Sequence, residues 1–139
     1  MIFTMSKIFI DTNILVYSLD QANPQKQMKA RTLLKTARTS RTGVLSTQVL
    51  QEFYVVATGK LKVEPTLAKK ITRSMANFTT VTVDFILIEH AMDICQSDKL
   101  SFWDALIVAA AFSAGCKAIW TEDLNHNQVI EGIEIVNPF

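Results

Sequence analysis

The sequence predicts an α/β fold in which a parallel sheet carries helices on both faces. Short runs rich in β-branched and aromatic residues alternate with longer amphipathic segments, an order that is typical of parallel sheets with helical crossovers. The chain has 139 residues, of which 49% are hydrophobic, so it can form one packed core. It contains no repeat, low-complexity tract or linker. We therefore expect a single domain over residues 1–139.

The predicted strands and helices follow one another along the chain. Five short runs with β-branched or aromatic side chains predict strands at residues 7–10, 44–46, 80–83, 117–120 and 134–136. Apolar residues at helical spacing predict helices at residues 14–19, 24–38, 47–58, 65–77, 85–96 and 102–114. Prolines at first helical positions and glycines just after last ones support several of these boundaries. The last strand is expected near an edge of the sheet.

The charge is unevenly distributed along the chain, although the net charge is only +1. Residues 21–83 hold eleven Lys or Arg and two acids, a formal charge of +9. Residues 84–139 hold two bases and nine acids, a formal charge of −7. A basic half can bind a phosphate backbone while an acidic half binds metal. For any single basic residue, solvation of an outer helix face is the simpler explanation.

Several classes of protein are disfavoured. The longest apolar run, residues 105–112, is too short to span a bilayer, and residues 1–7 lack the features of a secretory signal peptide. Cys95 and Cys116 are widely spaced in apolar helical contexts, so we expect reduced core residues in a cytoplasmic protein. No zinc-ligand spacing, Gly-rich phosphate loop, Ser-His-Asp set or Cys-His arrangement is present.

Four acidic residues lie where predicted strands or helices begin or end. Asp11 follows the first strand, and Asp123 follows the fourth. Glu52 lies at the margin of the apolar arc of its helix, and Asp104 lies in the first turn of a helix that is apolar all round. In open parallel sheets, ligand crevices form at the carboxyl ends of the strands. These four side chains are therefore candidates for one shared site.

Each of the four acids also has a simpler structural explanation. Asp11 could cap the following helix, and Glu52 could lie in the early turns of its helix because the helix dipole favours acids there. Ser101 and Asp104 have the spacing of a capping box, and Asp123 suits a turn after a strand. Capping and ligand binding are compatible, because a capped helix end can face the crevice.

A cluster of four acids has a definite chemical consequence. Several ionised carboxylates cannot crowd together without a counter-charge, so convergence of these acids implies divalent cations. Oxygen ligands without His or Cys favour Mg²⁺, with Mn²⁺ as the alternative, and the matching chemistry is phosphodiester hydrolysis. Thr121 could hydrogen-bond an acid or a phosphate oxygen. Glu122 is expected to point away from Asp123.

Five segments, taken in this order and at this spacing, resemble the PIN-domain ribonucleases, and within them the VapC-type toxins of bacterial toxin–antitoxin pairs. The segments are 9–17 (FIDTNILVY), 46–53 (STQVLQEF), 100–107 (LSFWDALI), 120–126 (WTEDLNH) and 136–139 (VNPF). The resemblance covers nearly the whole chain. Two departures are mild. Related sequences often have Ser where Thr121 stands and Gly where Asn127 stands, and Asn tolerates the same left-handed backbone.

The resemblance implies a three-layer PIN-like fold with a parallel sheet in the order 3-2-1-4-5. It also implies Mg²⁺-dependent endonucleolytic cleavage of RNA by a toxin that forms a homodimer and is silenced by a cognate antitoxin reaching into the site. The residues that match the family's catalytic, metal-binding acids are Asp11, Glu52, Asp104 and Asp123. Its polar supporting positions correspond to Asn13 and Thr121.

Three alternatives to an RNase toxin remain at this level. A PIN-type nuclease with a housekeeping role in RNA processing would share every motif. A non-catalytic RNA- or protein-binding module would be favoured by the loss of an acid, and all four are present. A haloacid-dehalogenase-like phosphatase also begins with an acid after a strand, but it needs a second carboxylate two residues later, where Asn13 stands.

Overall fold

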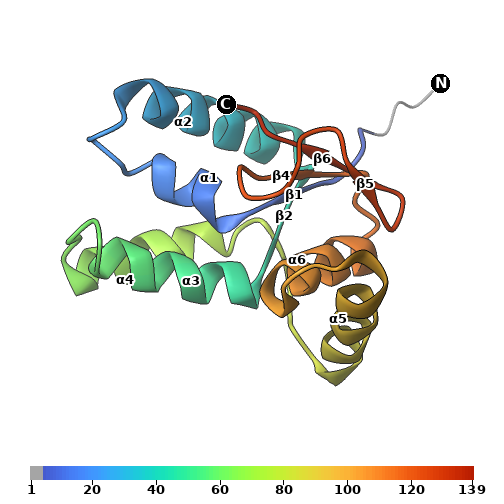
Figure 1. Ribbon diagram of the computed structural model, residues 1–139. Helices are drawn as coiled ribbons and strands as arrows, with labels where there is room; N and C mark the ends of the chain where they lie inside the picture. Colours follow the sequence, from blue (N-terminus) through green and yellow to red (C-terminus); the bar gives the residue numbers. More distant parts are fainter. Residues whose placement is uncertain (1–4) are drawn as a thin grey trace.

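A six-stranded sheet forms the centre of the computed structural model, which describes residues 5–139 (Figure 1). The signal-peptide expectation falls partly on residues 1–4, which lie outside the described residues. The strands are β1 (Ile8–Ile10), β2 (Gly43–Ser46), β3 (Thr79–Val81), β4 (Ala118–Trp120), β5 (Val129–Ile130) and β6 (Ile133–Val136). The helices are α1 (Thr12–Tyr17), α2 (Pro24–Ser40), α3 (Thr47–Thr58), α4 (Pro65–Met75), α5 (Phe85–Asp98) and α6 (Phe102–Ser113).

The sheet has the order β3-β2-β1-β4-β6-β5, and every neighbouring pair is parallel except β5 with β6. The predicted α/β class is confirmed, and the predicted order of five strands corresponds to β3-β2-β1-β4-β6. The last predicted strand, β6, lies near an edge of the sheet as predicted, but the strand that pairs outside it, β5, was not predicted. Strand β5 has only two residues, which is too few to show an alternation of apolar and polar side chains. It forms because Glu131 and Gly132, which both have positive φ, close a two-residue hairpin between β5 and β6.

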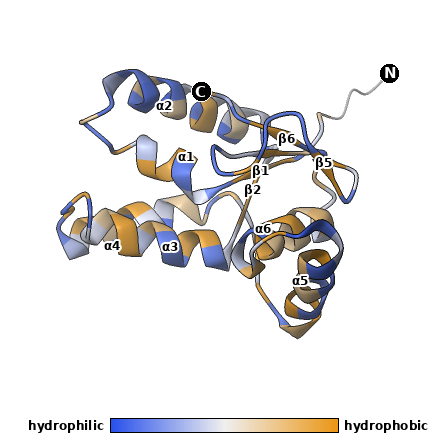
Figure 2. Ribbon diagram, in the orientation of Figure 1, coloured by the Kyte–Doolittle hydropathy of each residue, from blue (hydrophilic) through white to orange (hydrophobic). Residues whose placement is uncertain are grey.

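Helices cover both faces of the sheet, as predicted. In Figure 1, α2 lies on one side of the strands and the pair α5 and α6 lies on the other. Helix α6 packs against β2, β4 and β6, and residues 105–111 are all buried. This position explains why α6 is apolar around its whole circumference, as its ribbon in Figure 2 shows, whereas α2 is largely hydrophilic.

Local signals decide where the helices begin. Helix α1 begins two residues earlier than predicted, because Asp11 is its N-cap. Helix α3 begins after Ser46, whose side chain caps it by accepting a hydrogen bond from the backbone amide of Val49. Asn127 has a φ of 70°, the left-handed conformation expected from the glycine found there in similar sequences.

The two cysteines have the burial expected of core positions. Cys116 is buried, Cys95 is partly buried, and both thiols are free. Within residues 5–139, no helix has the length and apolar character that crossing a bilayer requires.

Candidate active site

The register of the central strands brings Asp11 and Thr121 together. Strands β1 and β4 are parallel, with Ile10 opposite Trp120, so the residues that follow leave the same edge of the sheet side by side. Thr121 Oγ1 donates a 2.7 Å hydrogen bond to Asp11 Oδ2, although the two residues are 110 positions apart. Both are buried, with Asp11 5% exposed and Thr121 fully covered. The site therefore begins at the switch between β1 and β4.

Asp11 serves as a helix cap as well as a site acid. Its Oδ1 accepts a 2.7 Å hydrogen bond from the backbone amide of Thr12, which opens α1. Its other oxygen is held by Thr121. The cap fixes the carboxyl group at the sheet edge and leaves it buried there, so the capping explanation and the site explanation both apply to this residue.

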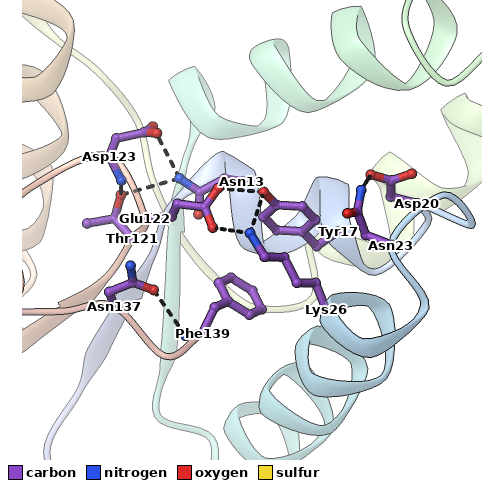
Figure 3. Close-up of polar contacts among 10 residues, drawn as sticks. All are labelled: Asn13, Tyr17, Asp20, Asn23, Lys26, Thr121, Glu122, Asp123, Asn137 and Phe139. Carbon is purple, nitrogen blue, oxygen red and sulfur yellow. Dashed lines mark hydrogen bonds and ion pairs between the residues drawn. The ribbon is translucent and has the colours of Figure 1, made fainter.

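Asn13 connects α1 to the loop after β4 (Figure 3). Its Nδ2 donates to Asp123 Oδ2 at 3.1 Å and to Thr121 Oγ1 at 3.3 Å. The backbone amide of Asp123 donates to Thr121 Oγ1 at 3.0 Å. One amide side chain thus holds the fourth acid beside the threonine that binds the first, which places Asp123 at the same edge as Asp11.

Glu52 reaches this edge from α3. Thr12 Oγ1 donates to Glu52 Oε2 at 2.9 Å, next to the residue that caps α1. Gln48, one turn before Glu52, donates from Nε2 to Glu52 Oε1 at 2.8 Å and to the backbone carbonyl of Trp103 at 3.2 Å. The same amide therefore links α3 to the first turn of α6, where Asp104 lies.

Asp104 lies at the start of α6 and is half-buried. Its backbone amide donates to Ser101 Oγ at 3.1 Å, which is the cap predicted from the sequence. Burial raises the pKa of the Asp104 carboxyl group, and the negative charges of Asp123 and Glu52 raise it further. Asp104 therefore lies within electrostatic range of both Asp123 and Glu52.

Asp11 is in the same electrostatic environment and is buried more deeply. Burial raises its pKa from 3.8 to about 6. Hydrogen bonds from Thr121 and Thr12 oppose this rise, whereas the charges of Asp123 and Glu52 add to it. Desolvation and like charges act together here, as they do in groups of carboxylates that share a site.

None of the four acids has a basic partner among the described residues. The ion pairs within residues 5–139 are Lys26 with Glu122 and His90 with Glu131, and neither includes a site acid. The carboxylates of Asp11, Glu52 and Asp123 are instead held by neutral donors from hydroxyl, amide and backbone groups. Within the part of the chain that the structure describes, no basic side chain offsets the negative charge of the four acids.

The acids are near one another without forming a closed metal cage. Among the described residues, no three acidic, histidine or cysteine side chains are gathered closely enough to hold an ion as they stand. The donor set nevertheless fits a hard divalent cation, because it consists of carboxylate oxygens with excess negative charge. Such an ion would have to draw these side chains inward from their neutral donors.

A second set of contacts, which no local pattern predicted, anchors the loop that carries Asp123 (Figure 3). Glu122 points away from the acids and accepts from Tyr17 OH at 2.5 Å and from Lys26 Nζ at 2.8 Å. Lys26 also lies 4.7 Å from the centre of the Tyr17 ring. Phe139 packs edge-on against Tyr17, with ring centroids 5.0 Å apart.

Two features could have indicated this anchor. Tyr17 lies one turn after Asn13 on α1, so both can reach the same loop. Glu122 points away from Asp123, as predicted, but the residue that it would pair with was not predicted. That partner, Lys26, comes from α2, a contact that no local pattern predicts.

Comparisons with known proteins agree with this architecture. The family model for the PIN domain matches residues 8–131. No curated protein matches the sequence. Among solved structures, the chain is similar to VapC20 of Mycobacterium tuberculosis, described as a sarcin–ricin loop cleaving toxin, with a TM-score of 0.67 and 18% identity over 84% of this chain and 92% of that one.

Two further solved structures are similar along almost their whole length. A chain of the DNA-bound VapBC complex of Salmonella typhimurium has a TM-score of 0.68 and 20% identity, covering 94% of this chain and 97% of that one. A chain of a toxin–antitoxin complex from Klebsiella pneumoniae has a TM-score of 0.69 and 21% identity, covering 96% and 98%. With the family model spanning most of the sequence, this chain belongs to the PIN domain family.

Proposed function

We propose that the protein is a metal-dependent endoribonuclease and the toxin of a toxin–antitoxin module, acting in the cytoplasm. The observation that carries the proposal is the group of four carboxylates at one sheet edge, which has no basic partner within residues 5–139. VapC20, a similar structure, is described as a cleaving toxin. The four acids and the PIN fold together favour a nuclease over a binding module.

Asp11, Glu52, Asp104 and Asp123 would hold Mg²⁺, or Mn²⁺ in its place. When bound, the cation would neutralise the cluster and supply the activation of water and the polarisation of phosphorus that phosphodiester hydrolysis requires. The chain itself supplies positioning. Thr121 and Asn13 keep Asp11 and Asp123 at one edge, so these acids are already oriented before RNA arrives.

The substrate would be bound through its backbone by the basic part of the chain. Helix α2 carries five of the eleven basic residues in this part, and their side chains are exposed except for Lys26, which is partly covered. They are Lys26, Lys29, Arg31, Lys35 and Arg38. The first of these, Lys26, binds the loop that carries Asp123, so α2 begins beside the acidic edge. RNA following α2 would reach the acids, and its binding should weaken as salt is raised.

The proposal is tested by incubating the purified protein with RNA and Mg²⁺ or Mn²⁺. We expect internal cleavage that is abolished by excess chelator and by Asp11→Asn. Asp93→Asn, which changes an exposed acid on α5, is the control and should cleave like the wild type. Cleavage that survives chelation or the loss of the Asp11 carboxylate would contradict a metal-dependent mechanism at this edge.

An antitoxin partner is proposed together with the toxin role, since two of the similar structures are toxin–antitoxin complexes. The surface that suits it is an open groove of about 620 Å³ between α3 and α4. Leu50, Tyr54 and Val55 provide its apolar side, and Lys69 and Arg73 line it from α4. An amphipathic helix with acidic residues would match both features.

A homodimer is the remaining part of the proposal. The start of α5 exposes Phe85 at 71% and Ile86 at 75%, and large apolar side chains exposed next to each other favour a protein contact. Light scattering on the purified chain, with Phe85→Ser and Ile86→Ser combined, tests this. We expect the mass of a dimer for the wild type and of a monomer for the variant. A monomeric wild type would refute the dimer and leave the nuclease proposal standing.

A further inference from the structure

Two buried oxygen atoms beside the acids have no partner. Within the described part of the chain, the buried side-chain polar atoms without a hydrogen bond are Gln48 Oε1 and Asn13 Oδ1. Both belong to amides whose nitrogen atoms hold a site acid, Glu52 in one case and Asp123 in the other. Unpaired buried acceptors are rare in folded proteins, and both of these lie at one site.

The orientation of the Gln48 amide follows from its neighbours. Both atoms that contact the amide nitrogen, Glu52 Oε1 and the Trp103 carbonyl oxygen, are acceptors, so the NH₂ group must face them. The amide oxygen therefore cannot exchange places with the nitrogen. It is held beside the Glu52 carboxylate, since the two amide atoms share one carbon, and the residue is only 6% exposed.

An acceptor in this position calls for a positive partner. Leaving a buried carbonyl oxygen unpaired costs about 1–3 kcal/mol. Among residues 5–139, no group donates a hydrogen bond to this oxygen, and no basic side chain pairs with the four acids. A neutral amide oxygen is, however, a good ligand or water acceptor for a hard divalent cation.

We propose that Gln48 is a residue of the cation site. Its NH₂ group positions Glu52 and ties α3 to α6, and its free oxygen faces the divalent cation, either directly or through a bound water. This inference rests on the proposed function, because it assumes that the four acids bind a divalent cation. It adds a neutral fifth oxygen donor to the acids and assigns a use to the unpaired atom.

The test measures Mn²⁺ binding to the intact protein by the loss of the free-ion electron paramagnetic resonance signal, with no RNA present. Gln48→Met keeps the length of the side chain and removes both polar groups, so we expect affinity to fall by roughly 10- to 100-fold. Gln51→Met changes an exposed glutamine on the same helix and should bind like the wild type.

A second variant separates contact with the cation from positioning of Glu52. Gln48→Glu removes the NH₂ donors and keeps an oxygen, now charged. If the oxygen faces the cation, this variant should bind Mn²⁺ at least as tightly as the wild type. Its melting temperature should fall in chelator, because two carboxylates then lie together, and should rise more than that of the wild type when Mn²⁺ is added.

The outcomes are distinguishable. Wild-type affinity in Gln48→Met would overturn this inference and leave the proposed function intact. Binding by Gln48→Glu as weak as that of Gln48→Met would also overturn it, because the residue would then only position Glu52. If Gln48→Met does not fold at the assay temperature, the comparison of Gln48→Glu with the wild type decides alone. Absence of Mn²⁺ binding in the wild type would refute both the inference and the metal-dependent function.

Discussion

Replacing Asp11 with asparagine should stabilise the cation-free protein while it removes activity. The carboxyl group is buried and lies near the negative charges of Asp123 and Glu52, and no basic residue within 5–139 pairs with it. Ionising it in the folded protein is therefore unfavourable. Asparagine has nearly the same shape, is itself a good N-cap and carries no charge. The variant should gain the free energy that the wild type loses on ionisation.

The magnitude follows from the pKa. The pKa of Asp11 is raised from 3.8 to about 6, and each pKa unit corresponds to about 1.4 kcal/mol, so the ionised carboxylate costs roughly 3 kcal/mol at neutral pH. The variant loses the acceptor for the Thr121 hydroxyl, which costs about 1 kcal/mol. The net gain is about 2 kcal/mol, or roughly 6 °C in melting temperature for a chain of this size.

The effect should depend on pH with a definite sign. The folded-state pKa lies above the unfolded value, so the folded protein binds the proton more tightly between pH 3.8 and about 6. The unfolding free energy of the wild type therefore falls as pH rises through this window. The advantage of Asp11→Asn should be full above about pH 7 and should disappear toward pH 4, where the wild-type carboxyl group is protonated.

The assay is thermal unfolding in chelator at pH 7.5 and pH 4.5, followed by circular dichroism. Asp93→Asn, on the exposed face of α5, should change the melting temperature little at either pH. Adding Mn²⁺ at pH 7.5 should raise the melting temperature of the wild type more than that of Asp11→Asn. If Asp11→Asn is less stable than the wild type at pH 7.5, or if its advantage is the same at both pH values, the electrostatic reasoning is wrong.

Three further changes test other parts of the molecule. Lys26→Glu should release the loop anchored by Glu122 and lower RNA cleavage by up to about fivefold, with partial recovery when Glu122→Lys is added; no recovery would argue against a direct pair. Gly43→Ala should destabilise the fold by about 1–3 kcal/mol in urea unfolding, because the added methyl carbon would lie 2.6 Å from the ring of buried Phe78; an unchanged midpoint would contradict this packing. Val55→Asp should weaken binding of the antitoxin encoded by a neighbouring reading frame and leave RNA cleavage unchanged, whereas lost cleavage would mean that the α3–α4 groove also serves the substrate.

The pattern of residues was enough to predict a parallel sheet, and the family resemblance supplied the order of five of its strands. Strand-forming runs that alternate with helical segments are typical of parallel strand pairing. The central strands were predicted correctly because each is a continuous apolar run. The two-residue β5 was missed, since its formation depends on left-handed backbone at Glu131 and Gly132 and not on a pattern of its own. A two-residue strand is too short to show an alternating pattern, so β5 can be recognised only from the hairpin that joins it to β6.

The sequence also supplied the acids and, through the family resemblance, the supporting positions Asn13 and Thr121, but not the individual hydrogen bonds that connect them. Asp11 and Asp123 could be named because each follows a strand, and in a parallel sheet such positions share one edge. The hydrogen bonds that hold them span the chain, as Thr121 to Asp11 and Thr12 to Glu52 do. The spacing of residues along the sequence does not predict such long-range hydrogen bonds. The structure shows which groups contact the acids, and the catalytic roles of the acids stay predictions.

The hydrogen-bond partners of individual side chains were decided by tertiary structure alone. Gln48 looked like one more polar residue at the start of a helix, and only the packing of α3 against α6 fixes its nitrogen on two acceptors and leaves its oxygen unpaired. Glu122 likewise acquires its role from Lys26, 96 positions away. Sequence determines which elements form, because that is set by neighbouring residues; which polar atoms remain unsatisfied depends on how those elements meet.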